Sequence, residues 1–384
     1  LLIVGTSPAI AAPKSVAAKK LTIIATVNAE SMVISGKTII TISNSDGVNS
    51  NILLTGLDIS GAQLWQKTID SGVDEIALAS AVDPLGNVWL AGASSAIPVV
   101  ESATAPVQAE NPDGVVAEPV TKLRGDMNQL TLWKLSPLGD LLGTYTLAQS
   151  APALISAVSV NASGVSIVGQ LLEKPFVVNA TSNGVFGKVI SIGTSKTALG
   201  AIVRHSDGSV SVFGSSAETL GGKKLAGVRD GVLIRVSKTG AIASVVRSSA
   251  PKANRTWLAA DSTLALTGFV KSGKIVETAF TKFTMAFAPT WTMRVPSLGT
   301  STVLTAGNTT YGAISSSAAV PGVIGWKPTS ASVLLLTLDG KGVVSGAYGS
   351  SEIAEPISMT YSKELGVVGL AKTAAQTLSL FKLA

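Results

Sequence analysis

Residues 82–92 read VDPLGNVWLAG, a polar turn led by an aspartate and followed by an apolar strand. Related segments are VNASGVSIVG at residues 160–169 and RHSDGSVSVFG at residues 204–214. An aspartate at the head of a tight turn accepts hydrogen bonds from the backbone ahead of it, and glycine supplies the positive φ that such turns require. The stretch therefore predicts a β-hairpin that the chain repeats, with Asp83 and Asp207 in structural roles.

Two kinds of hairpin alternate along the sequence. An inner type recurs seven times, at residues 32–43, 79–92, 157–169, 201–214, 258–268, 304–315 and 359–371. An outer type recurs six times, at residues 53–68, 130–147, 176–192, 232–246, 277–295 and 334–349. One inner and one outer hairpin make four strands, and a four-stranded unit repeating every ~40–50 residues is typical of β-propeller blades.

The count of hairpins predicts how the ring closes. The last inner hairpin is followed only by TLSLFKLA, residues 377–384, so its repeat lacks an outermost strand. Residues 19–27, KKLTIIATV, form an apolar strand that precedes the first inner hairpin. We therefore expect an all-β protein in which residues 19–384 form a single seven-bladed β-propeller of four-stranded antiparallel blades. Residues 19–27 would be the outermost strand of the blade containing 353–384, which leaves no open sheet edge.

Composition agrees with a folded all-β chain. Hydrophobic residues make up 46% of the 384 residues and charged residues only 14%, which excludes a disordered chain. The 38 glycines suit short strands and tight turns better than long helices. The absence of cysteine excludes disulfides, thiol nucleophiles and thiolate metal sites.

The first residues, LLIVGTSPAIAAPKS, resemble the second half of a secretory signal peptide. An apolar run is followed by Ala9 and Ala11, the small residues that a signal peptidase reads, so cleavage is expected after Ala11. We assign residues 1–18 to a truncated signal peptide and an N-terminal arm; a disordered Ala/Pro-rich arm is the alternative. No later segment has the ~18 apolar residues of a membrane span. The prediction is a secreted or cell-surface location.

The turn at residues 82–92 also carries a family resemblance. VDPLGNVWLAG matches, and HSDGSVSVFG partly matches, the D-x-x-G-N-x-[YW] turn of secreted bacterial β-propeller repeat proteins of the SBBP or NHL kind. The resemblance covers the chain that follows the signal peptide and implies a secreted bacterial propeller. It is a resemblance of repeat pattern, so it carries no active site.

The predicted blades have two different faces. The turns within hairpins are short and lie on one face, whereas the links between inner and outer hairpins lie on the other. Three such links are enlarged, at residues 93–127, 215–229 and 316–331. Short turns on one face and long loops on the other favour a recognition role for the long loops. Neutral insertion remains the alternative, since surface loops tolerate added length at little cost.

Charge and exposed side chains supply the candidate binding residues. A net charge of +6 and a pI near 9.4 favour anionic partners, such as an anionic glycan or polymer or an envelope protein. No dense basic run with interleaved aromatics is present, which argues against nucleic acid. Trp326 is the most exposed aromatic by its position in the third loop, whereas the other five tryptophans lie in strands and are expected to pack between blades. The binding candidates are Trp326, Lys223, Lys224, Arg229, Arg124 and Asp126.

Catalytic chemistry receives little support. The single histidine, His205, lies in a predicted tight turn, and the sequence has no G-x-S-x-G serine motif. The inner strands are nearly devoid of Asp and Glu, and the loop segment SNSDGVNSN, residues 43–51, lacks the spacing of an EF-hand. The loop acids Glu101, Glu110, Asp113, Glu118 and Asp126 fit a solvated surface better than a general acid and base.

We therefore expect no catalytic residue, metal or cofactor. Two function classes remain open. The first is a non-catalytic extracellular binding propeller that uses its long-loop face. The alternative is a propeller hydrolase or lyase acting on polysaccharide. The sequence leaves the ligand and the oligomeric state open.

Overall fold

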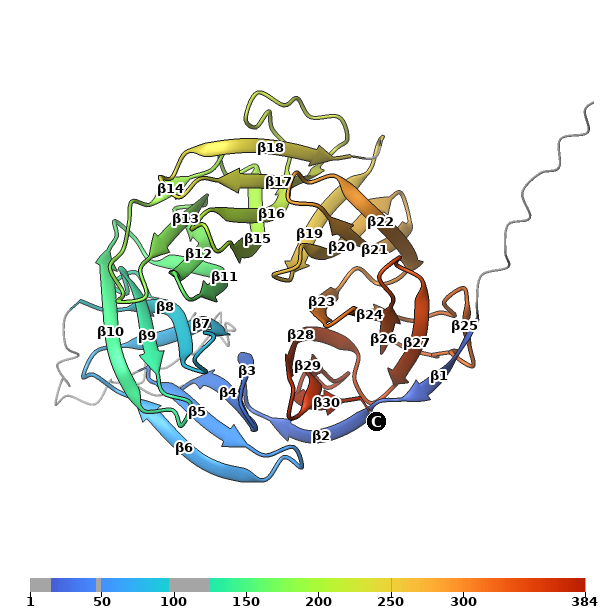
Figure 1. The fold of residues 1–384 in the computed structure, drawn as a ribbon, viewed down its shortest axis with the longest axis horizontal. Helices are drawn as coiled ribbons and strands as arrows, with labels where there is room; N and C mark the ends of the chain where they lie inside the picture. The colour runs from blue at the N-terminus through green and yellow to red at the C-terminus, as the bar shows by residue number, and fades with distance from the viewer. Residues whose placement is uncertain (1–14, 46–49, 97–123, 250, 384) are drawn as a thin grey trace, which may run out of the picture.

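The computed structural model describes residues 15–45, 50–96, 124–249 and 251–383, and all of its regular elements are β-strands. Six four-stranded sheets and one six-stranded sheet surround a central axis, and β3, β7, β11, β15, β19, β23 and β28 are the innermost strands (Figure 1).

Six sheets have four antiparallel strands, and successive strands step outward from the axis. The first sheet comprises β3 (Ser31–Ser35), β4 (Thr38–Asn44), β5 (Ile52–Leu57) and β6 (Gln63–Ile69), and the second comprises β7 (Glu75–Val82), β8 (Val88–Ser94), β9 (Gln129–Leu135) and β10 (Leu141–Ala148). The third comprises β11 (Ala153–Asn161), β12 (Gly164–Leu171), β13 (Lys174–Ala180) and β14 (Ile190–Ser191), and the fourth comprises β15 (Thr197–Arg204), β16 (Val210–Ser216), β17 (Asp230–Val236) and β18 (Ile242–Ser248). The fifth comprises β19 (Asn254–Ala260), β20 (Ala265–Ser272), β21 (Ile275–Phe283) and β22 (Pro289–Pro296), and the last comprises β28 (Glu355–Ser362), β29 (Gly366–Lys372), β30 (Leu378–Lys382) and β2 (Thr22–Val27). The prediction of an all-β propeller with four-stranded antiparallel blades is confirmed for these sheets.

The remaining sheet is mixed. Its antiparallel part comprises β23 (Ser301–Ala306), β24 (Thr309–Ser316), β26 (Ser332–Leu338) and β27 (Val344–Ser350). Two further strands, β1 (Val16–Lys20) and β25 (Val323–Ile324), extend it, and β1 runs parallel to both β27 and β25. This sheet departs from the uniform pattern that the sequence predicted.

The N-terminal strand pairs as predicted over part of its length. β2 is antiparallel to β30, with Thr22 opposite Lys382 and Val27 opposite Leu378. Lys19 and Lys20, which were assigned to the same strand, lie instead in β1 on the neighbouring sheet. The division falls at Leu21, which is fully buried and donates its backbone N–H to the Gly349 carbonyl at 3.0 Å. Burial of Leu21 therefore fixes the point where the chain passes from one sheet to the next.

The core lies between neighbouring sheets. One cluster, for example, joins Trp89 and Leu132 of the second sheet to Ile167 and Phe176 of the third. Trp89, Trp133 and Trp257 are fully buried, as expected for strand tryptophans, whereas Trp65 and Trp291 on outermost strands are half-buried. The apolar face of each sheet is therefore covered by its neighbours around the ring.

Gly92, the last residue of VDPLGNVWLAG, is required to be glycine for a steric reason. Gly92 lies beside an irregularity in the innermost strand, between Ala77 and Ala79, and a Cβ on it would approach the Ile76 carbonyl oxygen within 3.0 Å. Gly169, Gly214 and Gly268 repeat this arrangement in the next three sheets, each beside an irregularity of the innermost strand and against a backbone carbonyl. A β-bulge of this kind bends its strand, and only glycine lets the paired strand approach it.

The turns agree with the roles expected for their aspartates. Asp83 accepts hydrogen bonds from the backbone N–H groups of Leu85 and Asn87 and from the Trp89 indole, at 2.9, 2.9 and 3.2 Å. Burial alone would raise the pKa of Asp83, but the hydrogen bonds outweigh it and lower the pKa overall. The turn and the strand that follows it are therefore joined by one carboxylate.

Gly214→Ala should destabilise the protein by about 2–3 kcal/mol, because the added methyl meets a backbone carbonyl that cannot rotate away. Gly340→Ala is the matched control, since a Cβ there meets nothing within 4 Å, and we expect a change within about 0.5 kcal/mol. Urea unfolding of both variants measures the difference. Equal stability of the two variants would contradict the bulge argument.

Candidate functional site

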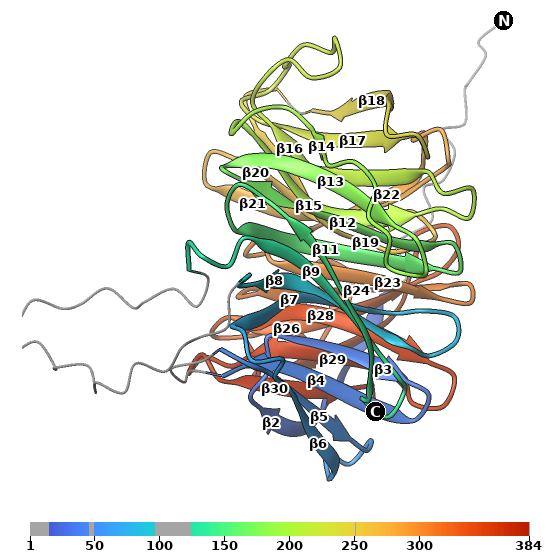
Figure 2. The same cartoon turned by 90° about the vertical axis from the view of Figure 1, so that its left-hand side faces the viewer.

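Because successive strands of each sheet run in opposite directions, the connections between them lie on two opposite faces of the ring, seen at the left and right of Figure 2. One face carries the hairpin turns, such as residues 83–87 and 205–209, and is called the tight-turn face. The other carries the links between hairpins, including the described residues 124–128, 217–229 and 317–331, and is called the long-loop face. The second face is where the sequence placed its binding candidates.

Asp74 anchors the base of the first long link. It is fully buried, it accepts a hydrogen bond from the Ser50 N–H at 2.7 Å, and it pairs with the Arg124 guanidinium. Arg124 also pairs with Asp126 at 3.0 Å, and hydrogen bonds to Asp126 and Asp74 raise its pKa. Ser95, on the other side of the link, donates its N–H to the Asp74 carbonyl at 2.9 Å. Arg124 is thus an anchor of the link.

Residues 97–123 of this link, and with them Glu101, Glu110, Asp113 and Glu118, lie outside the described residues.

A buried ion pair organises the second link. Arg247 donates to Asp230 at 3.0 Å, and both side chains are almost completely buried. Asp230 also accepts from the backbone N–H groups of Ala226 and Gly227 at 2.9 and 2.8 Å, while Arg247 donates to the Lys223 carbonyl at 3.1 Å. Burial tends to raise the pKa of Asp230, but these hydrogen bonds lower it overall. Arg247 also donates to the Glu218 carbonyl, so the pair holds the backbone of the link at several points.

The predicted basic cluster in this link is only partly available for binding. Lys223 and Lys224 are exposed. Arg229 is half-buried and donates to the Lys196 carbonyl at 3.2 Å and to Ser215 Oγ at 3.3 Å. Two of the three cations face solvent, and the third joins the link to the rest of its sheet.

The expectation that Trp326 is exposed is wrong. Only 8% of its surface is accessible, and its ring lies against Gly349 of β27, where a Cβ would collide with ring carbons. The ring packs with Val320 and Val323 of its own link and with Ala347. Gly349 supplied the one available signal, because a glycine inside a strand marks a close approach.

Two hollows flank the third link. One, of about 330 Å³, is lined by Trp326, Lys327 and Pro328 together with Lys20 and Glu352, which form an ion pair at 3.0 Å. The other, of about 450 Å³, lies between the mixed sheet and the last sheet; its lining residues include Leu298, Thr300, Ser315, Ser330, Glu355 and Gln376. The third link is therefore a ridge between two depressions, and their lining is mostly polar or small.

Several carboxylates of this face already have partners, whereas the side chain of Glu355, which lines one of the hollows, makes no hydrogen bond or ion pair with the described residues. Asp74 and Asp230 are paired with arginines, and Glu218 accepts from Thr194 and Thr197. Burial raises the pKa of Glu75, but its side chain is almost wholly buried and accepts from Ser71. These groups hold loops together, and a carboxylate in such a position is poorly placed to exchange protons with a substrate.

His205 occupies a tight turn, as expected. Its backbone N–H donates to the Ser209 carbonyl at 2.9 Å, and its Nε2 lies 2.7 Å from Ser211 Oγ. Burial, followed by the charge of Arg235, lowers the pKa of His205 to about 4, so the ring is neutral at pH 7.

Within the described residues, no group of three or more His, Cys, Asp or Glu side chains is arranged to hold a metal ion. The same part of the chain has no helix long and apolar enough to cross a membrane.

Comparisons with known proteins support the fold. No protein-family model matches the chain, and no curated protein matches it. Among solved structures, the WD40 domain of coronin from Toxoplasma gondii is 12% identical with a TM-score of 0.52, covering 96% of this chain and 88% of that one. An oligogalacturonate lyase from Vibrio parahaemolyticus is 12% identical with a TM-score of 0.50, covering 97% and 92%.

The β-propeller domain of the Trilobed protease from Pyrococcus furiosus is 11% identical with a TM-score of 0.45, covering 95% and 96%. At such identities, the two structures with TM-scores of 0.50 or more show a β-propeller fold and nothing finer. Because a WD40 domain and a lyase resemble the chain equally, the fold alone does not decide between binding and catalysis.

Asp230→Asn should cost about 3 kcal/mol at pH 7, since it leaves the buried Arg247 without its counter-charge. The folded-state pKa of Asp230 is lowered, so its contribution is present above the ordinary value of 3.8 and is lost as the pH falls through the folded pKa. Urea unfolding at several pH values should therefore show the gap to the wild type closing in acid. Asp126→Asn, at an exposed carboxylate, is the control and should change stability by less than about 1 kcal/mol. A gap for Asp230→Asn that does not change with pH would contradict this assignment.

Proposed function

We propose that this protein is a non-catalytic binding propeller that acts outside the cytoplasm and recognises a protein or glycan of the cell envelope through its long-loop face. The observation that carries the proposal is the third link, a ridge with a hollow on either side. The ion pairs Arg124–Asp74 and Arg247–Asp230 add support, because they anchor the described end of the first link and the backbone of the second. A surface ordered before binding loses less conformational entropy when a partner docks.

We also propose that the propeller has seven blades. The mixed sheet is treated as one blade to which β1 and β25 are added, giving seven blades. The antiparallel pairing of β2 with β30 would then close the ring and protect the edge of β30.

The alternative of a polysaccharide hydrolase requires a pair of carboxyl groups near the substrate, and that of a lyase requires a general base there. The long-loop carboxylates Asp74, Asp230, Glu75 and Glu218 are instead engaged with arginines, serine and threonines. This pattern favours binding over catalysis.

The extracytoplasmic location rests on the signal-like residues 1–11 and on the resemblance to secreted bacterial propellers. Mass spectrometry of the protein recovered from its native source should show a chain that begins at or near Ala12. An intact N-terminus in the cytoplasmic fraction would exclude the secretory proposal and the envelope partners with it.

The binding face can be tested on partners found by glycan array and by envelope pull-down. We expect Lys327→Ala combined with Gln376→Gly to weaken binding about tenfold, since the two residues line separate hollows beside the ridge. Both side chains are exposed, and Gln376 has a positive φ that glycine adopts readily, so the fold should persist. Trp326→Ala is a poorer probe, because removal of a buried ring destabilises the protein by itself.

Lys341→Ala, an exposed lysine in a turn of the opposite face, is the control and should leave affinity unchanged. Loss of binding in the Lys341 variant but not in the double variant would place the working surface on the tight-turn face.

A further inference from the structure

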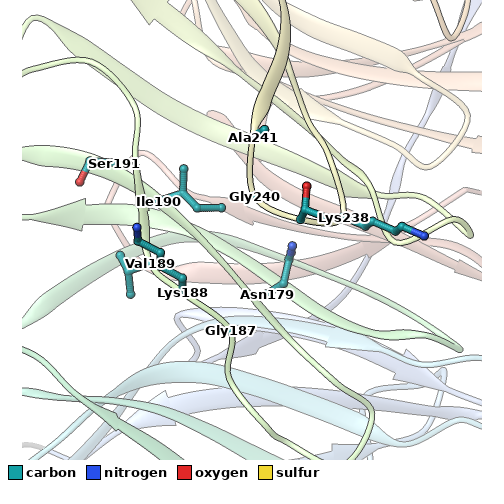
Figure 3. A pocket seen from close by; sticks show the side chains of 10 residues that line it. Asn179, Gly187, Lys188, Val189, Ile190, Ser191, Lys238, Gly240 and Ala241 are labelled. Carbon is teal, nitrogen blue, oxygen red and sulfur yellow. The ribbon is translucent and has the colours of Figure 1, made fainter.

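A second candidate site lies on the tight-turn face and at the rim, between the third and fourth sheets. A groove of about 600 Å³ runs between β14 and the turn at residues 237–241 (Figure 3). A hollow of about 470 Å³ continues it toward the turn at residues 205–209. The two share Asn179, Gly187 and Lys238, so they form one radial groove.

The groove exists because the side chain that packs on the turn glycine of the next sheet is smaller here than at three other junctions. At three junctions an aromatic ring from an outermost strand covers the positive-φ glycine in the next sheet's turn: Trp65 over Gly139, Tyr145 over Gly184 and Trp291 over Gly342. At the β14 junction the covering residue is Ile190, whose Cδ1 would lie 3.0 Å from a Cβ on Gly240. A branched aliphatic side chain therefore stands where other junctions carry a ring.

The only other aliphatic cover of this kind among the described residues is Ile24 and Ala25 over Gly61, and a hollow of about 310 Å³ lies there too. That hollow is lined by no charged side chain, with Thr41, Ser43, Thr55, Gln63 and Gln66 among its polar residues. An aliphatic side chain over the turn glycine therefore leaves a hollow between the sheets in both places. The positive charge of the β14 groove does not follow from that packing, because the hollow beside Gly61 lacks it.

About half of the residues that line the β14 groove are glycine or apolar, and its polar residues are cations and hydrogen-bond donors. Lys188 and Lys238 lie on opposite sides of it and are exposed, and neither makes a hydrogen bond or ion pair with the described residues (Figure 3). Half-buried Arg204 lies in the adjoining hollow and also has no carboxylate partner there. The one carboxylate of the lining, Asp207, accepts from Ser209 N and Oγ at 2.9 and 2.7 Å. The lining thus carries an excess of positive charge.

A hydrogen-bond chain fixes the donor at the centre of the groove. Arg204 Nη1 donates to the buried Ser166 Oγ at 2.9 Å, and Ser166 Oγ donates to Asn179 Oδ1 at 2.6 Å. The Asn179 amide nitrogen makes no hydrogen bond with the described residues, and the side chain points into the space between β14 and the Lys238–Ala241 turn (Figure 3). Since its oxygen is already engaged, Asn179 presents a donor to the groove.

We propose that this groove binds carboxylated sugar residues of an anionic polysaccharide. The missing ring leaves room for a pyranose, the lysines and the Asn179 amide suit a carboxylate, and the Ser191 and Thr239 side chains suit sugar hydroxyls. An acidic peptide would use the same charges but has no ring to occupy the place that Trp65 and Trp291 fill elsewhere. This site is separate from the long-loop face and stands whether or not that face binds a partner.

The test is calorimetric titration of the full chain with trigalacturonic acid, with galactotriose as the uncharged counterpart. We expect binding of the acid that weakens with added salt, and at least tenfold weaker binding of the neutral sugar. Hexaglutamate and sodium sulfate are the competing probes and should bind at least tenfold more weakly than the uronate. No uronate binding at millimolar concentration, equal binding of galactotriose, or tighter binding of hexaglutamate or sulfate would each overturn the proposal.

Three variants locate the site. Lys188→Ala with Lys238→Ala should weaken uronate binding about tenfold or more. Asn179→Asp keeps the acceptor for Ser166 but replaces the donor by a negative charge, so it should weaken binding at least as much. Ile190→Trp should restore the aromatic cover over Gly240 and abolish binding without lowering the melting temperature, which separates loss of the groove from loss of the fold.

Lys271→Ala with Lys274→Ala is the matched control, because it removes the same charge from exposed residues of the opposite face. Unchanged affinity in the three groove variants, or an equal loss in this control, would overturn the assignment.

Discussion

The close approach of glycine to a neighbouring backbone or ring is the constraint on which the rest of the structure depends. Gly92 and its three counterparts permit the innermost strands to bulge, and the glycines of the outer turns permit the next sheet to approach. A side chain at the first set would meet a carbonyl oxygen, and at the second it would meet Trp65, Tyr145 or Trp291. Because interiors are close-packed, neither set has room for a substitute.

This constraint leaves the two faces comparatively free to vary. Each sheet buries its apolar surface against its neighbours around the ring, so most of the core lies in the strands, although the third link adds Val320, Val323 and Trp326 to it. The links need anchors of their own, and the ion pairs of the buried carboxylates Asp74 and Asp230 supply them. A buried pair is weak evidence for net stability, but removing one member is costly, which makes it a firm anchor for a loop.

The features that the sequence predicted correctly are those that depend on residues close together in the chain. The hairpins, the aspartate-led turns, the burial of Trp89, Trp133 and Trp257 and the pairing of Thr22–Val27 with the last sheet all follow from periodicity and turn residues. What it missed depends on contacts between distant segments. Trp326 is covered because Gly349 leaves room for its ring, and Val16–Lys20 form a strand because β27 and β25 lie beside them. Neither partner can be identified from the local pattern of either segment.

The two candidate sites differ in the same way, because one follows from the local sequence and the other depends on contacts between distant segments. The long-loop face was identified from loop lengths, whereas the groove beside β14 depends on which side chain of one sheet covers a glycine of the next. Five turns between outer strands carry such a covered glycine, and only comparison of the covering side chains shows which junctions are open. A propeller with this contact can therefore gain a binding groove by losing a ring, with no insertion and no new element. The cations at β14, absent from the similar hollow beside Gly61, then determine what kind of ligand the open junction takes.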